Sequence, residues 1–248
     1  TEKKITAILP VHVLGNICEM PRLLQLAAQY HLTIVEDATE ALGSYYDKTH
    51  AGSFGEFGCL SFNGNKIITT GGGGMILTND ESIAKQAKHI TTQAKSKPDE
   101  YYHDAVGYNY RLVNILAAMG VAQMEQLPGF LKRKNEITKV YNQAFEKIHG
   151  LQPQSITKQV EANHWLYTVR TPNQPSLRKY LWDQGVEARP FWVPMNQLPS
   201  FKNSMYYHEA DHSDAVYKSC LSLPCSTGIT DGEIEQVIRL VLQFYNHY

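Results

Sequence analysis

Residues 5–37, ITAILPVHVLGNICEMPRLLQLAAQYHLTIVED, decide the fold of this chain. The apolar run 5–9 predicts a buried strand, and Pro21 suits the first turn of a helix whose apolar side chains then share one face. The β-rich run LTIVED (32–37) predicts a second strand that ends in two acids. Such strand–helix–strand units build parallel sheets. Because ligands bind at the carboxyl ends of strands in open parallel sheets, Glu36 and Asp37 are expected near a site.

The pattern downstream continues this α/β domain as far as residue 127. GCLSFN (58–63) and MILT (75–78) predict two further short strands, and a helix follows from about Glu81. Apolar residues between Val113 and Met124 then keep the i, i+3, i+4, i+7 spacing of an amphipathic helix. Pro128 and Gly129 predict the end of that helix.

After residue 127 the pattern changes to that of a small α+β domain, which we expect over residues 128–248. A second long helix is predicted to run to Gly150, and it links the two domains. Thr230 and Glu233 form the spacing of a capping box before a last amphipathic helix. The other elements expected in this domain are a strand at 164–171, a helix at 175–184 and a strand at 186–192.

Composition excludes several classes of protein. The 248 residues are 43% hydrophobic and 19% charged, with a net charge of −1, so neither nucleic acid nor an anionic membrane is an expected partner. No apolar run reaches membrane-spanning length, and the apolar part of the N-terminus is too short for a signal peptide. The four cysteines show no CxxC or Cys/His metal spacing. We therefore expect a reduced, cytoplasmic protein without a metal site.

The stretch SFNGNKIITTGGGG (61–74) places Lys66 between a polar turn and four glycines. The glycine run is neither a P-loop, since no Lys-Ser/Thr follows, nor a dinucleotide fingerprint, since a strand comes next. Taken singly, the glycines indicate a tight turn, Lys66 a surface lysine and Asp37 a strand-end carboxylate. Taken together, they suit pyridoxal phosphate. This cofactor needs an amine for a Schiff base, a carboxylate for its pyridine nitrogen, and donors such as Ser61 for its phosphate.

Four segments resemble the StrS/DegT-type sugar-nucleotide aminotransferases. The longest is VEDATEALGSYYDKTHAGSFGEFGCLSFNGNKIITTGGGGMILTND (35–80), which is similar to that family's pattern EDAAQA–GS–GSFG–SF–K–TTGEGG–TND. The others are GYNYRLVNILAAMG (107–120), PVHVLGN (10–16) and RPFWVPMNQLP (189–199). The resemblance implies the type I aminotransferase fold: part of the large domain, with a mixed, mostly parallel sheet and helices, followed by a small C-terminal domain. It also implies pyridoxal phosphate as cofactor.

The resemblance further implies a role for each matched residue. Lys66 would form the internal aldimine and move the proton, Asp37 would pair with the pyridinium nitrogen, and Ser61 would hold the phosphate. Glu40 stands where many members have Gln or His and would face the ring. Asn109 and Arg111 would reach across a homodimer interface into the neighbouring site. His12 and Arg189 would lie on the substrate side or at the neighbouring subunit, although a loop histidine such as His12 also suits a capping role.

The substrate implied by the resemblance is a keto-sugar nucleotide, with glutamate as amino donor. Gly72 stands where the family usually has Glu, and Asn63 stands where a His is common. The variant is most similar to the branch that acts on UDP-4-keto-6-deoxy-N-acetylglucosamine for surface-glycan or nonulosonic acid synthesis. Two alternatives stay open: a non-catalytic relative that binds cofactor or sugar nucleotide, and a dehydratase of the same fold. The presence of Lys66 argues against both.

The start of the chain carries one more expectation. The sequence opens on a predicted buried strand without an initiator Met, so we expect further residues upstream. The resemblance implies that they would supply a Gly-Thr-Ser/Ala phosphate segment and an aromatic residue that stacks on the ring. We therefore expect these 248 residues to hold only part of the cofactor pocket and to be weakly active or inactive alone.

Overall fold

The computed structural model describes residues 4–97 and 99–247, which divide into two compact units. The first unit comprises Thr1–Leu131 and Ile156–Trp165, and the second comprises Lys132–Ser155 and Leu166–Tyr248. The sequence placed this division between residues 127 and 128, and did not indicate that 156–165 returns to the first unit. None of the helices in the described residues has both the length and the apolar character that crossing a membrane requires.

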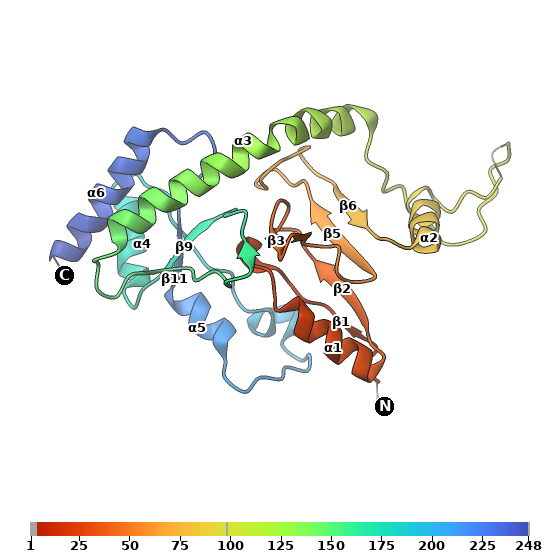
Figure 1. The fold of residues 1–248 in the computed structure, drawn as a ribbon, viewed down its shortest axis with the longest axis horizontal. Helices are drawn as coiled ribbons and strands as arrows, with labels where there is room; N and C mark the ends of the chain where they lie inside the picture. The colour runs from red at the N-terminus through yellow and green to blue at the C-terminus, as the bar shows by residue number, and fades with distance from the viewer. Residues whose placement is uncertain (1–3, 98, 248) are drawn as a thin grey trace. The chain divides into compact units, whose positions relative to one another are not determined.

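The first unit is built on a four-stranded sheet in the order β1-β2-β5-β6 (Figure 1). Its strands are β1 (Ala7–Ile8), β2 (Thr33–Asp37), β5 (Phe57–Ser61) and β6 (Gly74–Leu77). The first three are parallel, as expected, and β6 runs antiparallel to β5. The helix α1 (Met20–Tyr30), with Pro21 in its first turn, connects β1 to β2 and packs on both. This is the strand–helix–strand unit that residues 5–37 predict.

Smaller elements complete the first unit. A second sheet has the order β4-β3-β8, from β3 (Tyr45–Tyr46), β4 (Thr49–His50) and β8 (Val160–Glu161). Through β8, the segment 156–165 joins this unit. The helix α2 (Glu81–Thr91) begins where Asp80 accepts hydrogen bonds from the backbone N–H groups of Ser82 and Ile83. A short 3₁₀ turn, η1 (Val13–Gly15), follows β1.

The predicted helix break at Pro128 and Gly129 is wrong. One helix, α3 (Asn114–Phe145), continues through both residues and belongs to both units. A proline inside a helix costs about 3 kcal/mol, but packing on either side offsets this. Before the proline, Gln123 accepts a hydrogen bond from Thr69 N–H at 3.3 Å, and beyond it Tyr141 and other side chains of α3 are fully buried.

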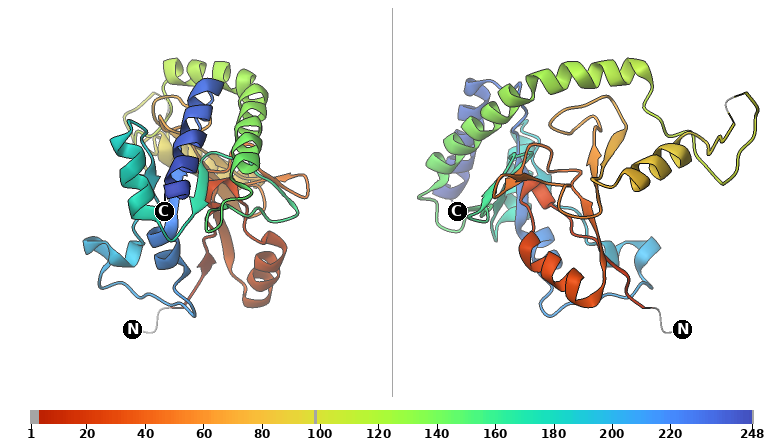
Figure 2. Two further views of the ribbon diagram at one scale, coloured as in Figure 1. Left: turned by 90° about the vertical axis from the view of Figure 1, so that its left-hand side faces the viewer. Right: turned by 45° about the vertical axis from the view of Figure 1, so that its right-hand side comes forward.

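In the second unit, α4 (Gln174–Asp183), α6 (Asp231–His247) and the end of α3 pack around an antiparallel sheet (Figure 2). The sheet order is β10-β11-β9-β7, from β7 (Gln152–Pro153), β9 (Tyr167–Arg170), β10 (Arg189–Pro190) and β11 (Cys220–Leu223). The unit also contains the helix α5 (His212–Ser219) and the short turns η2 (Met195–Gln197) and η3 (Pro199–Phe201).

The core and the last helix of the second unit follow the sequence pattern. The core contains the stacked rings of Tyr141 and Phe145, and the tilted ring of Tyr167 packs against both. The capping box is confirmed: Thr230 Oγ1 accepts from Glu233 N–H at 3.2 Å, and the Glu233 carboxylate accepts from Thr230 N–H at 2.8 Å. The sequence analysis did not identify α5 or β11.

Candidate active site

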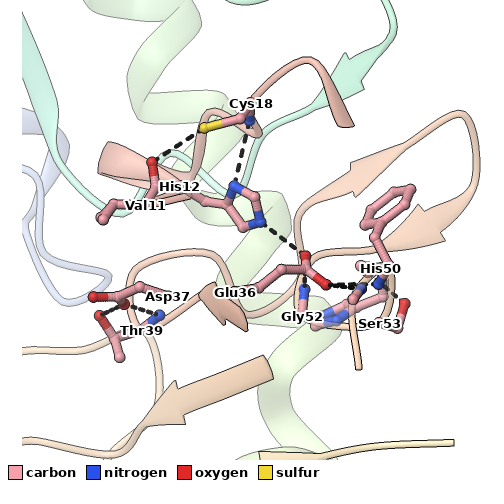
Figure 3. A network of polar contacts seen from close by, with 11 residues as sticks. Val11, His12, Cys18, Glu36, Asp37, Thr39, His50, Gly52 and Ser53 are labelled. Atoms are coloured by element: carbon pink, nitrogen blue, oxygen red, sulfur yellow. Dashed lines mark hydrogen bonds and ion pairs between the residues drawn. The ribbon is translucent and has the colours of Figure 1, made fainter. Parts of the chain in front are cut away.

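Asp37 and Ser61 lie at the carboxyl ends of neighbouring parallel strands, because β2 and β5 pair in register at Asp37 and Cys59. Asp37 Oδ1 accepts hydrogen bonds from the Thr39 backbone N–H at 3.1 Å and from its hydroxyl at 2.7 Å (Figure 3). Among residues 4–97 and 99–247, no donor is bonded to the other carboxylate oxygen of this half-buried side chain. The Oδ2 atom of Asp37 is therefore free to accept a further hydrogen bond.

Lys66 stands on a closed loop between β5 and β6. Its backbone N–H donates to Asn63 O at 3.0 Å, and the loop closes where Phe62 N–H donates to Gly73 O at 3.0 Å. Gly73 has a φ of +93°, and a side chain at Gly74 would lie 2.4 Å from a backbone oxygen of β5. The glycine run therefore provides both the left-handed backbone and the close approach that fix the loop.

The Lys66 amine lies between a carboxylate and an aromatic ring. Its Nζ is 3.9 Å from Glu40 Oε1 and 3.9 Å from the centre of the Trp165 ring, and its side chain is 14% exposed. Burial lowers the pKa of Lys66, against the opposing charges of Glu40 and Asp37. Burial raises the pKa of Glu40, whose Oε2 accepts from Leu14 N–H at 2.7 Å. Both shifts favour the neutral forms and bring the proton affinities of the two groups closer together.

Several of these side chains meet at one small cavity of about 10 Å³, roughly the space of one water molecule. It is lined by Thr39, Glu40, Leu42, Ser61, Lys66, Ile67, Asn163 and Trp165. The structure thus brings together three residues that the sequence analysis singled out, Glu40, Ser61 and Lys66. Asn163 and Trp165 are additions from the segment 156–165.

A fully buried carboxylate, Glu36, lies behind the carboxyl edge of the sheet. Glu36 Oε1 accepts from the backbone N–H groups of Phe54 and Gly55 at 2.6 and 2.7 Å, and Oε2 accepts from Gly52 N–H at 2.8 Å. His12 Nε2 lies 2.9 Å from Oε2 and donates the fourth hydrogen bond (Figure 3). Successive residues of a strand face opposite sides, so Glu36 fixes the GSFG loop while Asp37 is left for the site.

The side chains of His12 and Glu36 have no exposed surface, and they stabilise each other's charge. Burial disfavours the charged forms of both. For His12, hydrogen bonds and charges of Cys18 and Glu36 outweigh burial and raise its pKa to about 9. For Glu36, the hydrogen bonds from His12 and from the 52–55 backbone lower the pKa despite burial. His12 therefore packs inside the first unit and shapes the loop that holds Glu40, a role closer to capping than to substrate contact.

The other expected site residues make no hydrogen bond to this group. Asn109 pairs through its backbone with Thr92, and the exposed Arg111 forms no ion pair within the described residues. Arg189, in the second unit, is exposed and bonds Glu187 at 2.6 Å. Their expected roles at a neighbouring subunit or a substrate stay predictions. In the part of the chain that the structure describes, no group of three or more His, Cys, Asp or Glu side chains is arranged to hold a metal ion.

Comparison with known proteins identifies the family. Residues 1–242 match the sequence profile of the DegT/DnrJ/EryC1/StrS aminotransferase family. The chain belongs to this family. It is 34% identical over 97% of its length to the putative pyridoxal phosphate-dependent aminotransferase EpsN of Bacillus subtilis, of which it covers 63%. It is 33% identical over 99% of its length to GDP-perosamine synthase of Escherichia coli O157:H7, of which it covers 68%.

The fold expectation is confirmed as well. The aminotransferase PseC of Helicobacter pylori, involved in the biosynthesis of pseudoaminic acid, superimposes with a TM-score of 0.91 at 22% identity, over 98% of this chain and 67% of that one. The match supports the type I aminotransferase fold. This member of the DegT/DnrJ/EryC1/StrS family thus spans about two thirds of the length of these relatives.

The sequence did not reveal Asn163 and Trp165, and it placed Glu36 near the site without indicating its partners. Glu36 was noted only as a strand-end acid, although the alternation of β2 would have placed it on the side opposite Asp37. Trp165 was included in a strand that in fact begins at Tyr167. Asn163 carried no local signal, because its partners Glu40 and Leu42 lie more than 120 residues earlier.

Proposed function

We propose that the chain takes part in pyridoxal-phosphate-dependent transfer of an amino group from glutamate to a 4-keto-6-deoxy sugar nucleotide. The product would serve polysaccharide, lipopolysaccharide or nonulosonic acid synthesis. The observation that carries the proposal is the poorly exposed Lys66 amine beside Glu40, on a loop next to the Asp37 strand end. Membership of an aminotransferase family supports it.

The residues present fit the cofactor. The lowered pKa of Lys66 makes a neutral amine easier to reach, as a Schiff-base lysine requires. Asp37 has a carboxylate oxygen free for a protonated ring nitrogen, and Ser61 offers a hydroxyl at the neighbouring strand end. When bound, pyridoxal phosphate would supply an electron sink for the amino-transfer chemistry.

The protein's own groups would bind and move protons around that electron sink. Asp37 would hold the ring nitrogen in its charged form through its free oxygen. Lys66 would carry a proton to and from the reacting carbon, with Glu40 as the nearby group that adjusts its charge. Ser61 would donate to the phosphate, and Asn109 and Arg111 would complete the neighbouring site of a homodimer.

The sugar nucleotide is the open part of the proposal. The sequence pattern 61–74 favours a UDP-linked 4-keto-6-deoxy-N-acetylhexosamine, whereas the name of the E. coli relative points to a GDP-linked sugar. His12 is buried and so is left out of substrate contact, while Arg189 is exposed and stays a candidate for it. Both nucleotides therefore belong in the assay.

The test is covalent capture of pyridoxal phosphate followed by turnover. The 248-residue protein is mixed with pyridoxal phosphate, reduced with borohydride and digested, and the labelled lysine is located by mass spectrometry. We expect the label at Lys66, its loss in Lys66→Ala and its retention in Lys147→Ala, which removes an exposed lysine. Label at another lysine in the wild type would contradict the assignment.

Turnover is then measured as 2-oxoglutarate formed from glutamate, with UDP- or GDP-linked 4-keto-6-deoxy sugars as acceptors. We expect at most slow formation by these 248 residues alone, with one nucleotide class, and none in Lys66→Ala. Capture at Lys66 without turnover on either acceptor would fit both the non-catalytic alternative and a pocket that these residues hold only in part.

A further inference from the structure

The segment 163–165 returns to the first unit and contacts both sides of the Glu40–Lys66 pair. Asn163 is 2% exposed, and its amide Nδ2 donates to Glu40 O at 2.8 Å and to Leu42 O at 2.9 Å. Its backbone N–H donates to Ser44 Oγ at 2.9 Å. The segment is therefore fixed to the chain that carries Glu40.

Gly15 shows how closely this segment fits. A Cβ at Gly15 would lie 2.0 Å from Asn163 Oδ1, so the glycine of PVHVLGN leaves the space that the Asn163 side chain fills. Asn163 Oδ1 in turn accepts from Trp165 N–H at 2.9 Å. The bonds of Asn163 thus place the backbone of Trp165 as well as the chain around Glu40.

Trp165 contacts Lys66 in two ways. Its indole Nε1–H donates to Asn65 O at 2.6 Å, which holds the turn directly before the lysine. The face of its ring lies under the Lys66 ammonium, 3.9 Å from centre to Nζ. Trp165 is 3% exposed, so its ring also keeps water from one side of the amine.

The ring has two opposite effects on the charge of the amine. A ring face attracts an ammonium, whereas the removal of water disfavours it. The remaining charged groups that act on Lys66, Glu40 and Asp37, favour the ammonium. Burial is the largest cause of the lowered pKa, and the Trp165 ring supplies one side of that burial.

We propose that Trp165 is a positioning residue for Lys66, and that Asn163 anchors it. This inference rests on the proposed function for its catalytic meaning, because Lys66 is the amine that function requires. The proposed function assigns roles to Lys66, Asp37 and Ser61 but none to the segment 163–165, and this inference supplies one.

The test measures Lys66 directly in cofactor-free protein. Wild type, Trp165→Leu and Trp165→Phe are labelled with acetic anhydride over a range of pH, and the rate at Lys66 is followed by mass spectrometry. Lys147 in the same digests is the internal standard. Trp182→Leu, which removes an exposed tryptophan of the second unit, is the matched control.

Trp165→Leu removes both the ring face and the indole N–H. We expect the limiting rate at high pH to rise about tenfold, and the midpoint of the profile to move up toward that of an ordinary lysine, because burial is the main cause that lowers it. Trp165→Phe keeps a ring face but lacks the bond to Asn65 O. It should raise the limiting rate by only about threefold, with a midpoint close to wild type.

Circular dichroism checks that each variant is folded before its labelling is compared with wild type. If Trp165→Leu does not fold, the test uses Trp165→Phe alone. Lys66 profiles that coincide with wild type in the folded variants, or that change equally in Trp182→Leu, overturn the inference.

Borohydride capture of pyridoxal phosphate by the wild type separates this inference from the proposed function. Trp165-dependent labelling of Lys66 without capture would refute the function and leave the positioning in place. Capture at Lys66 with labelling that does not depend on Trp165 would refute the positioning alone.

Discussion

The buried pair of His12 and Glu36 predicts a specific dependence of stability on pH. His12→Gln tests it, because a glutamine amide can donate to Glu36 as His12 Nε2 does, yet never carries a charge. The pKa of His12 is raised from 6.5 to about 9 in the folded protein, because Cys18 and Glu36 outweigh its burial. A raised pKa means that the stabilisation is complete below pH 6.5 and is lost as pH rises through about 9.

The size of the effect follows from that change in proton affinity. Each tenfold change is worth about 1.4 kcal/mol, so the charged imidazole contributes up to about 3 kcal/mol. The assay is urea unfolding of wild type and His12→Gln between about pH 6 and about pH 9.5. The difference between the two free energies of unfolding removes the contributions of groups that titrate alike in both proteins. We expect the difference in free energy of unfolding to be largest near pH 6 and to shrink by up to this amount as pH rises. His149→Gln, at an exposed site, should match wild type throughout.

A difference that does not vary with pH would refute this reasoning. It would mean that His12 is neutral when folded, held as the Nε2–H tautomer because its Nδ1 accepts from Cys18 N–H at 3.3 Å.

Three further predictions concern packing, capping and subunit exchange. Gly55→Ala should lower the free energy of unfolding by about 2–3 kcal/mol in urea titrations, because its Cβ would lie 2.5 Å from a carbonyl oxygen of β2. Gly64→Ala is the control, because a Cβ there meets open space and should leave this free energy unchanged. Thr230→Val should cost about 1 kcal/mol by the same measurement, because it removes the cap of α6. Mixing Lys66→Ala with Arg111→Ala subunits should restore part of the transaminase rate, and no recovery would contradict a composite site.

Much of the first unit could be predicted from its sequence, because its signals are local. The run LTIVED is rich in β-branched residues and ends in acid, and α1 has a proline start and an apolar face. Together they predict adjacent parallel strands with Asp37 at the edge. The capping box at Thr230 is equally local. Each of these rests on residues a few positions apart, where propensity and periodicity operate.

The features that the sequence did not predict depend on contacts between residues far apart in the chain. The break expected at Pro128 follows local helix propensity, which the packing at Gln123 and Tyr141 overrides. The partners of Glu36 lie 16 to 24 residues away, and no spacing rule connects them. The contact between Trp165 and Lys66 joins two segments about 100 residues apart, and no sequence pattern links them.

That contact has a consequence for the order in which the protein takes shape during translation. Trp165 and Asn65 are 100 residues apart, and Asn163 and Glu40 are 123 apart. At about 5–20 residues per second, a ribosome needs on the order of 5–20 s to reach Trp165 after it has made Lys66. Throughout that interval the nascent chain presents Lys66 without the Trp165 ring that covers it. The time at which this contact can form is therefore set by the pace of synthesis, and slow codons between 66 and 165 would prolong the exposed state.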